Sequence, residues 1–181
     1  IVILLRSPGS VGIHFQRALE AKGIRCNTGG GQDLLQTEEI GTLRSLLQVI
    51  VNPRQDIPLL AVLRSLLWNL STDELAEIRL ADRKSDLYDA LKKRAEAEDE
   101  LGRKLTDFLE KLTLYREKSR EYDTAELIWY LLMQTGFYEA QAAMRGGELR
   151  RMNLRLLYTR AAEFEKTGLK GLYNFVRFID E

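Results

Sequence analysis

Residues 101–115 read LGRKLTDFLEKLTLY, and this stretch decides the fold class of the chain. Its large apolar side chains recur every three or four residues, at positions 101, 105, 108, 109, 112 and 115. In an α-helix of 3.6 residues per turn these positions form one stripe, while the charged residues between them face water. The stretch therefore predicts a long amphipathic helix.

Helix boundary signals lie on both sides of this stretch. The spacing of a capping box occurs twice, in Ser71-Thr72-Asp73-Glu74 and in Asp123 with Glu126. In a capping box, the N-cap side chain accepts a hydrogen bond from the N–H of the third helical residue, and the side chain of that residue accepts one from the N–H of the N-cap. Gly146-Gly147 and Gly168 follow helical patterns and are typical helix ends. These signals predict a series of helices over the second half of the chain.

Residues 37–66 predict two further helices. Thr37 is the expected N-cap of a helix that ends at Asn52-Pro53, because proline disfavours the helical conformation in the residue before it. Asp56 is the expected N-cap of the next helix. After the helix that follows Ser71, residues 81–85 (ADRKS) form a polar joint.

The start of the chain has a different pattern. Ile1 to Leu5 is a continuous apolar run, which predicts a buried strand. A short helix ending at Gly23 and a second strand over 24–27 follow, and this crossover makes the two strands parallel. The sequence thus predicts a mainly α protein, in which a small parallel α/β remnant with two short strands precedes a helical bundle. Because the apolar run begins at residue 1, we expect the chain to be a piece of a longer protein.

Composition excludes several classes of function. The 27 Lys and Arg residues balance 27 Asp and Glu, so the net charge of +0 gives no global attraction to nucleic acid or membrane. One cysteine and one histidine cannot build a disulfide framework or a zinc site, and they fit a reducing, cytoplasmic setting. No apolar run is long enough to span a membrane. The absence of any Gly-Lys pair excludes a phosphate-binding loop, so we expect no metal and no cofactor in this chain itself.

Positive charge gathers around one predicted helix, at Arg145, Arg150, Arg151, Arg155 and Arg160. Arg151 and Arg155 are one turn apart and share a face. Two interpretations stay open: a weak, non-specific contact with nucleic-acid phosphates, or a solvated face whose charge is diluted by two glutamates. Aromatic residues at helical spacing in this region are interpreted as core: Tyr158, Phe164, Tyr173, Phe175 and Phe178.

The order of motifs along the chain resembles a known family. IVILLRS at 1–7 and LLQVIVNPRQD at 46–56 resemble the start of the second motor half of UvrD-like, superfamily 1 DNA helicases. DIPLLAVLRS at 56–65 and LSTDELAEIR at 70–79 are similar to the AddA (RexA) subunits of bacterial helicase–nucleases. The end of the chain has the same resemblance, which covers essentially all 181 residues.

This resemblance implies an architecture and a set of roles. Residues 1–82 would be part of the RecA-like motor domain 2A, and residues 83–181 the helical insertion 2B. In the family, the arginine that closes the LLRS-type motif reaches the γ-phosphate of ATP across the motor cleft, and Arg6 is the matching position. Arg64 begins a turn for which the resemblance implies a DNA contact, and relatives often have glycine where this chain has Asn69.

Two functions follow from these observations. The first is a fragment of an ATP-dependent DNA helicase and exonuclease acting in double-strand break repair and recombination. This piece would engage duplex DNA through Arg64, Arg151 and Arg155, and Arg6 would complete the ATP cleft. ATP, Mg²⁺ and a second subunit of the AddB or RexB type would belong to the parent protein, so the fragment alone is expected to be inactive. The second is a stand-alone helical protein-interaction module without nucleotide chemistry.

Overall fold

The computed structural model describes residues 3, 11–12, 14–15, 18–19, 21–24 and 34–180. The chain divides into two compact units, residues 1–37 and residues 38–181. The described part is mainly helical, as the sequence predicts, and contains no strand. The predicted strands at 1–5 and 24–27 lie outside the described residues except for Ile3 and Ile24, and neither of these two residues is in a strand.

In the first unit, the predicted helix end at Gly23 is confirmed. Residues 11–12, 14–15 and 18–19 are helical, and Gly23 has a φ of +74°. The carbonyl oxygen of Leu19 accepts hydrogen bonds from the N–H groups of residues 22 and 24, both at 3.0 Å. Glycine suits this ending because a side chain resists the left-handed backbone conformation. A 3₁₀ turn, η1 (Leu34–Gln36), follows later in this unit.

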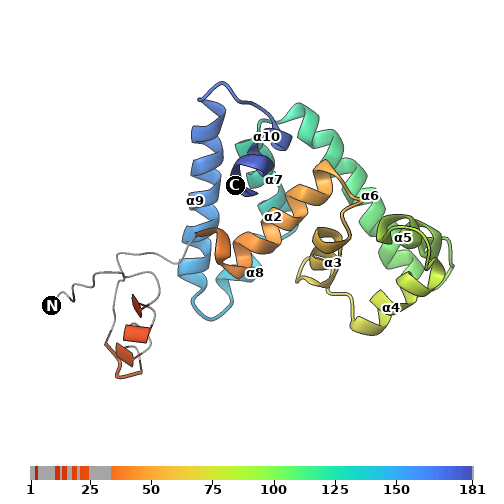
Figure 1. The fold of residues 1–181 in the computed structure, drawn as a ribbon, viewed down its shortest axis with the longest axis horizontal. Coiled ribbons are helices and arrows are strands. Elements are labelled where there is room, and N and C mark those ends of the chain that lie inside the picture. The colour runs from red at the N-terminus through yellow and green to blue at the C-terminus, as the bar shows by residue number, and fades with distance from the viewer. Residues whose placement is uncertain are drawn as a thin grey trace. The chain divides into compact units, whose positions relative to one another are not determined.

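The second unit is a bundle of helices joined by short turns (Figure 1). In chain order they are α2 (Glu38–Val51), α3 (Asp56–Arg64), α4 (Thr72–Ala81), α5 (Leu87–Ala95), α6 (Glu100–Glu121), α7 (Thr124–Gln134), α8 (Phe137–Ala142), α9 (Gly147–Glu165) and α10 (Leu172–Asp180). Helices α3, α4 and α5 form one group, and α7, α8 and α9 pack on one another, with α9 and α10 against α2. Helix α6 contacts both groups, through α5 near its start and through α2 and α7 toward its end.

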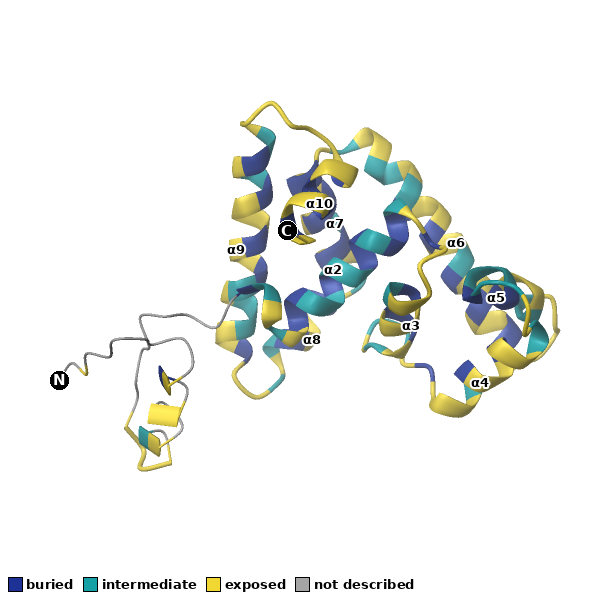
Figure 2. Ribbon diagram, viewed as in Figure 1, coloured by how far each residue is buried: buried dark blue, intermediate teal, exposed yellow. Residues whose placement is uncertain are grey.

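The predicted stripe of α6 lies in the core (Figure 2). Leu105, Phe108 and Leu112 are almost completely buried, and the indole of Trp68 packs edge-on against Phe108 with 5.0 Å between ring centroids. Leu109, at the margin of the stripe, is half-buried. Because burying a large apolar side chain contributes about 1.5–3 kcal/mol, this stripe is a principal source of the stability of the fold.

Both predicted capping boxes are confirmed. The N–H of Glu74 donates to Ser71 Oγ at 3.1 Å, and the N–H of Ser71 donates to the Glu74 carboxylate at 2.7 Å. Asp123 and Glu126 repeat this arrangement at 2.8 and 3.2 Å. The hydrogen bond from the Ser71 backbone lowers the pKa of Glu74, so this carboxylate stays ionised at the helix start, where the helix dipole favours negative charge.

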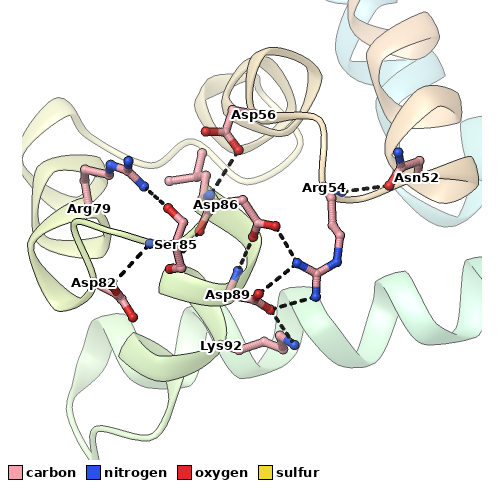
Figure 3. Close-up of polar contacts among 10 residues, drawn as sticks. Asn52, Arg54, Asp56, Arg79, Asp82, Ser85, Asp86, Asp89 and Lys92 are labelled. Carbon is pink, nitrogen blue, oxygen red and sulfur yellow. Dashed lines mark hydrogen bonds and ion pairs between the residues drawn. The ribbon is translucent and has the colours of Figure 1, made fainter.

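The predicted role of Asp56 as an N-cap is wrong. Gln55 holds the N-cap position of α3, and Asp56 is the first residue of that helix. Its Oδ1 instead accepts a hydrogen bond from the N–H of Leu87 at 3.0 Å, at the start of α5. Figure 3 shows that Arg54 reaches the same end of α5, where it pairs with Asp89 at 2.8 Å. Asp56, at the start of α3, therefore accepts a hydrogen bond from a free amide of the neighbouring helix α5 instead of capping its own helix.

The boundary predicted between residues 82 and 83 falls in the turn between α4 and α5. Asp82 closes this turn, because its Oδ1 accepts hydrogen bonds from the N–H groups of Lys84 and Ser85 at 3.0 and 3.3 Å. Helices α4 and α5 pack against each other across it. The polar joint is thus confirmed, while the division into domains 2A and 2B stays a prediction.

Candidate nucleic-acid interface

A tight turn between α8 and α9 sets the geometry of the candidate interface. Gly146 has a φ of +74°, and a Cβ atom at Gly147 would lie 2.0 Å from the carbonyl oxygen of Ala142. Glycine is therefore required at 147, where the two helices approach closely. The predicted helix boundary at this glycine pair is confirmed.

The predicted shared face of Arg151 and Arg155 is also confirmed, and it lies against Tyr138 of α8. The guanidinium carbons of Arg151 and Arg155 lie over this ring, 5.5 and 5.7 Å from its centroid. Tyr138 is only 4% exposed, and its hydroxyl has no hydrogen-bond partner within the described residues. The ring therefore acts through its π face, to which the two cations are attracted.

Trp129 packs on Tyr138, and Tyr158 packs on Trp129. Trp129 of α7 lies 5.6 Å from Tyr138 and 5.7 Å from Tyr158 of α9, measured between ring centroids. Trp129 and Tyr158 are 39% and 37% exposed, so both rings reach the surface. We call Trp129, Tyr138, Arg151, Arg155 and Tyr158 the arginine–aromatic surface.

The charges of Arg151 and Arg155 are not neutralised within the described part of the chain. In residues 34–180, neither side chain forms a hydrogen bond or ion pair with a carboxylate. Arg150, their neighbour on α9, differs: it binds Glu38 at 3.0 Å and the buried Glu39 at 3.3 Å, both on α2. Arg150 thus joins two helices, whereas the N–H donors of Arg151 and Arg155 have no hydrogen-bond partner within residues 34–180.

Arg64 lies at the end of α3, outside the arginine–aromatic surface. Its Nη1 donates to Thr72 Oγ1 at 2.8 Å, which ties the end of α3 to the start of α4. The turn between them is closed by Asn69, which has a φ of +51° and whose N–H donates to the Ser65 carbonyl at 2.7 Å. Asparagine tolerates this left-handed conformation better than most residues.

Arg6 lies outside the described residues, so its role in an ATP cleft stays a prediction. The described residues also contain no group of three His, Cys, Asp or Glu side chains that could hold a metal ion. Of the acidic residues that precede α6, Asp99 has a structural role, because it caps that helix through Gly102 and pairs with Arg94 at 2.7 Å. These contacts, the pair with Arg94 first, lower the pKa of Asp99 to about 2.

Sequence reasoning missed the aromatic half of this surface. Trp129 and Tyr138 belong to different helices, so no spacing along the chain brings them to Arg151. The interpretation of the later aromatic residues as core is correct for Phe164 and Phe175, which are buried. It is wrong for three others, which are substantially exposed: Tyr158 at 37%, Tyr173 at 61% and Phe178 at 55%. Apolar and aromatic residues occur on more than one face of α9 and α10, and this pattern could have indicated that some of these rings are exposed.

The amino-acid sequence is similar to a known protein family and to several bacterial proteins. The family model of the UvrD-like helicase C-terminal domain matches residues 1–179. An ATP-dependent helicase/nuclease subunit of Acetivibrio thermocellus is 47% identical over 182 residues, which cover 100% of this chain and 14% of that protein. Proteins of the same name from Thermoanaerobacter sp. and Clostridium novyi are each 44% identical over 99% of this chain and 15% of their own length. The chain thus spans about a seventh of these relatives. No helix among the described residues is long and apolar enough to cross a membrane.

Proposed function

Because the chain belongs to the family of UvrD-like helicase C-terminal domains, we propose that it works as part of an ATP-dependent DNA helicase–nuclease. The name that relatives 44–47% identical to it carry supports this proposal. In this role the parent protein would process double-strand ends in repair and recombination, beside a second subunit of the AddB or RexB type. ATP and Mg²⁺ would be held mainly by the remainder of the protein, with Arg6 completing the cleft.

Within that protein, the arginine–aromatic surface would engage duplex DNA. The observation that carries this proposal is the manner in which Arg151 and Arg155 are held. A carboxylate partner would fix a guanidinium but cancel its charge, whereas the Tyr138 ring orients both groups and leaves their charge intact. Two fixed cations one helical turn apart suit phosphate oxygens, which position a protein on DNA without specifying a sequence.

The test is a salt series of duplex binding with the full-length protein. Each phosphate contact contributes about 0.9 to the slope of log K against log salt, so Arg151→Ala/Arg155→Ala should flatten the slope by about 2 units. The effect should be the same on unrelated DNA sequences, because phosphates are common to all.

A matched control removes two arginines elsewhere. Arg83 and Arg103 are exposed, and neither side chain has a hydrogen-bonded or ion-paired partner within residues 34–180. Arg83→Ala/Arg103→Ala should leave the slope unchanged. If the two double variants change the slope equally, only overall charge matters and the arginine–aromatic surface is a solvated face.

One observation favours the alternative of a protein-interaction module. Leu149, Met152 and Leu156 form an apolar stripe on the outer side of α9, and each is 45–60% exposed. Such a stripe is typical of a helix with a protein partner. Absence of duplex binding by the parent protein, together with a protein partner lost in Met152→Ser, would favour this second function.

A further inference from the structure

A second charged feature lies away from the arginine–aromatic surface. A cleft of about 330 Å³ opens where the end of α2, the last turns of α6 and the start of α10 meet. Its polar lining consists of Arg116, Ser119 and Arg120 from α6, with Lys170, Gly171 and Tyr173 at the start of α10. This volume is at the lower end of the range for ligand pockets.

The cleft concentrates positive charge without an acidic lining residue. Arg116 and Arg120 are one helical turn apart, a spacing at which like charges repel. Within residues 34–180, neither guanidinium has a hydrogen-bond or ion-pair partner. Lys170 adds a third cation, and no carboxylate is among the residues that line the cleft. An anion placed here would relieve the repulsion and meet charged donors from two helices.

The start of α10 adds backbone donors to the same cleft. Gly171, with a φ of +90°, has no side chain to cap the helix. Phe175 makes the first backbone bond of this helix, to the Gly171 carbonyl at 3.2 Å, so the amides of Leu172 and Tyr173 lack helical partners. Glu165, at the end of α9, already accepts a hydrogen bond from the Gly171 amide and interacts with Lys170, so the amides of Leu172 and Tyr173 are the backbone donors left for a ligand.

We propose that this cleft binds a phosphate group. Three cations provide the charge, the amides of α10 that lack helical partners provide hydrogen bonds, and Tyr173, 61% exposed, can pack on a sugar or base that the phosphate carries. The phosphate would come from a DNA strand or from the free inorganic ion. This site is independent of the proposed function, because it requires neither ATP nor helicase activity.

The test is an NMR titration of the ¹⁵N-labelled 181-residue chain. In one arm, sodium phosphate is added against sodium chloride of equal ionic strength, and in the other a short blunt DNA duplex is added. Phosphate should shift the amides of Leu172 and Tyr173 saturably, and chloride should not. If the same amides respond to duplex at lower concentration, the phosphate of DNA is the ligand; a response to phosphate only identifies the free ion.

Variants decide whether the cleft itself is responsible. Arg116→Gln/Arg120→Gln should weaken phosphate binding about tenfold or more, since both charge-assisted hydrogen bonds from α6 are lost. Arg83→Gln/Arg103→Gln makes the same charge change elsewhere and should leave binding unchanged. Lys170→Gln, at an exposed site, gives a second and milder test. No saturable shift in either arm, or equal weakening in the control, would overturn the proposal.

Discussion

Tyr138 is the side chain that orients Arg151 and Arg155 of α9. Its ring contacts the two arginines and its hydroxyl does not, so the two groups can be tested separately. The hydroxyl is buried without a partner among the described residues, so Tyr138→Phe should leave stability unchanged or raise it slightly. Tyr138→Leu removes the π face and should lower the free energy of unfolding by about 1–2 kcal/mol for two cation–π contacts, in addition to any cavity. Urea denaturation of both variants measures the difference; equal losses would show that the ring does not hold the arginines.

Arg6 carries the prediction that concerns ATP. If it reaches the γ-phosphate in the parent protein, Arg6→Ala should lower ATP turnover by about 10³-fold or more and change nucleotide affinity far less, as for a group that acts on the transition state. Arg6→Lys should restore little activity, because a point charge cannot reproduce the planar guanidinium. Steady-state kinetics with a nucleotide-binding assay separates these effects, and parallel losses of turnover and affinity would assign Arg6 to ground-state binding.

At the scale of elements, Glu165 joins the ends of three helices. It closes α9, accepts hydrogen bonds from the backbone N–H and hydroxyl of Thr124 at the start of α7, and binds the Gly171 amide before α10. Burial opposes ionisation of this group, but the hydrogen bonds from Thr124 and Gly171 outweigh it, so the pKa of Glu165 lies below its ordinary value.

The lowered pKa of Glu165 gives a pH-dependent prediction. A carboxylate with a lowered pKa in the folded state stabilises the fold above its ordinary pKa, and this contribution disappears as the pH falls through the lowered value. Glu165→Gln should therefore lower the free energy of unfolding by about 1–2 kcal/mol near neutral pH, and its difference from wild type should close as the pH falls through the lowered pKa of Glu165. Glu163→Gln, an exposed change on the same helix, is the control. A difference that persists unchanged in acid would contradict the role of the carboxylate charge.

How far the sequence predicts these elements depends on whether local or tertiary contacts define them. Helix α6 and the capped starts of α4 and α7 follow from periodicity and local hydrogen bonds, so they were predictable. Helix α5 is not predicted, because its nine residues bury only Leu87, Ala90 and Leu91 and it depends on packing against α4 and α6. Asp56 fails as a cap for the same reason: its partner, Leu87, is 31 positions away.

The candidate site divides in the same way. Arg151 and Arg155 share a face because they are four positions apart, and that much follows from helix geometry. Tyr138 reaches them only through the tight turn at Gly147, and the phosphate cleft needs α6 and α10 to meet, which no local pattern encodes. Apolar spacing wrongly assigns Tyr173 to the core, because spacing does not state which face of a short helix is covered.

At the scale of the whole molecule, the chain should not hydrolyse ATP by itself. It has no Gly-Lys pair and hence no phosphate-binding loop, and the proposed function assigns ATP binding to the remainder of the parent protein. A coupled phosphate-release assay on the pure chain, with and without DNA, should give no turnover above buffer. Turnover that disappears on changing a residue of this chain would contradict the assignment of the ATP site to the remainder of the protein.

Helix α6 has a mechanical consequence. Its 22 residues form an unbroken ladder of about 33 Å without proline, and the helix is held by α5 near one end and by α2 and α7 near the other. A continuous helix held at both ends resists bending. A force applied to α3–α5 would therefore be transmitted along α6 to α7–α10, because α6 has no flexible hinge at which the force would be lost. If the proposed function is correct, residues 38–180 would transmit force within the parent helicase as one stiff part.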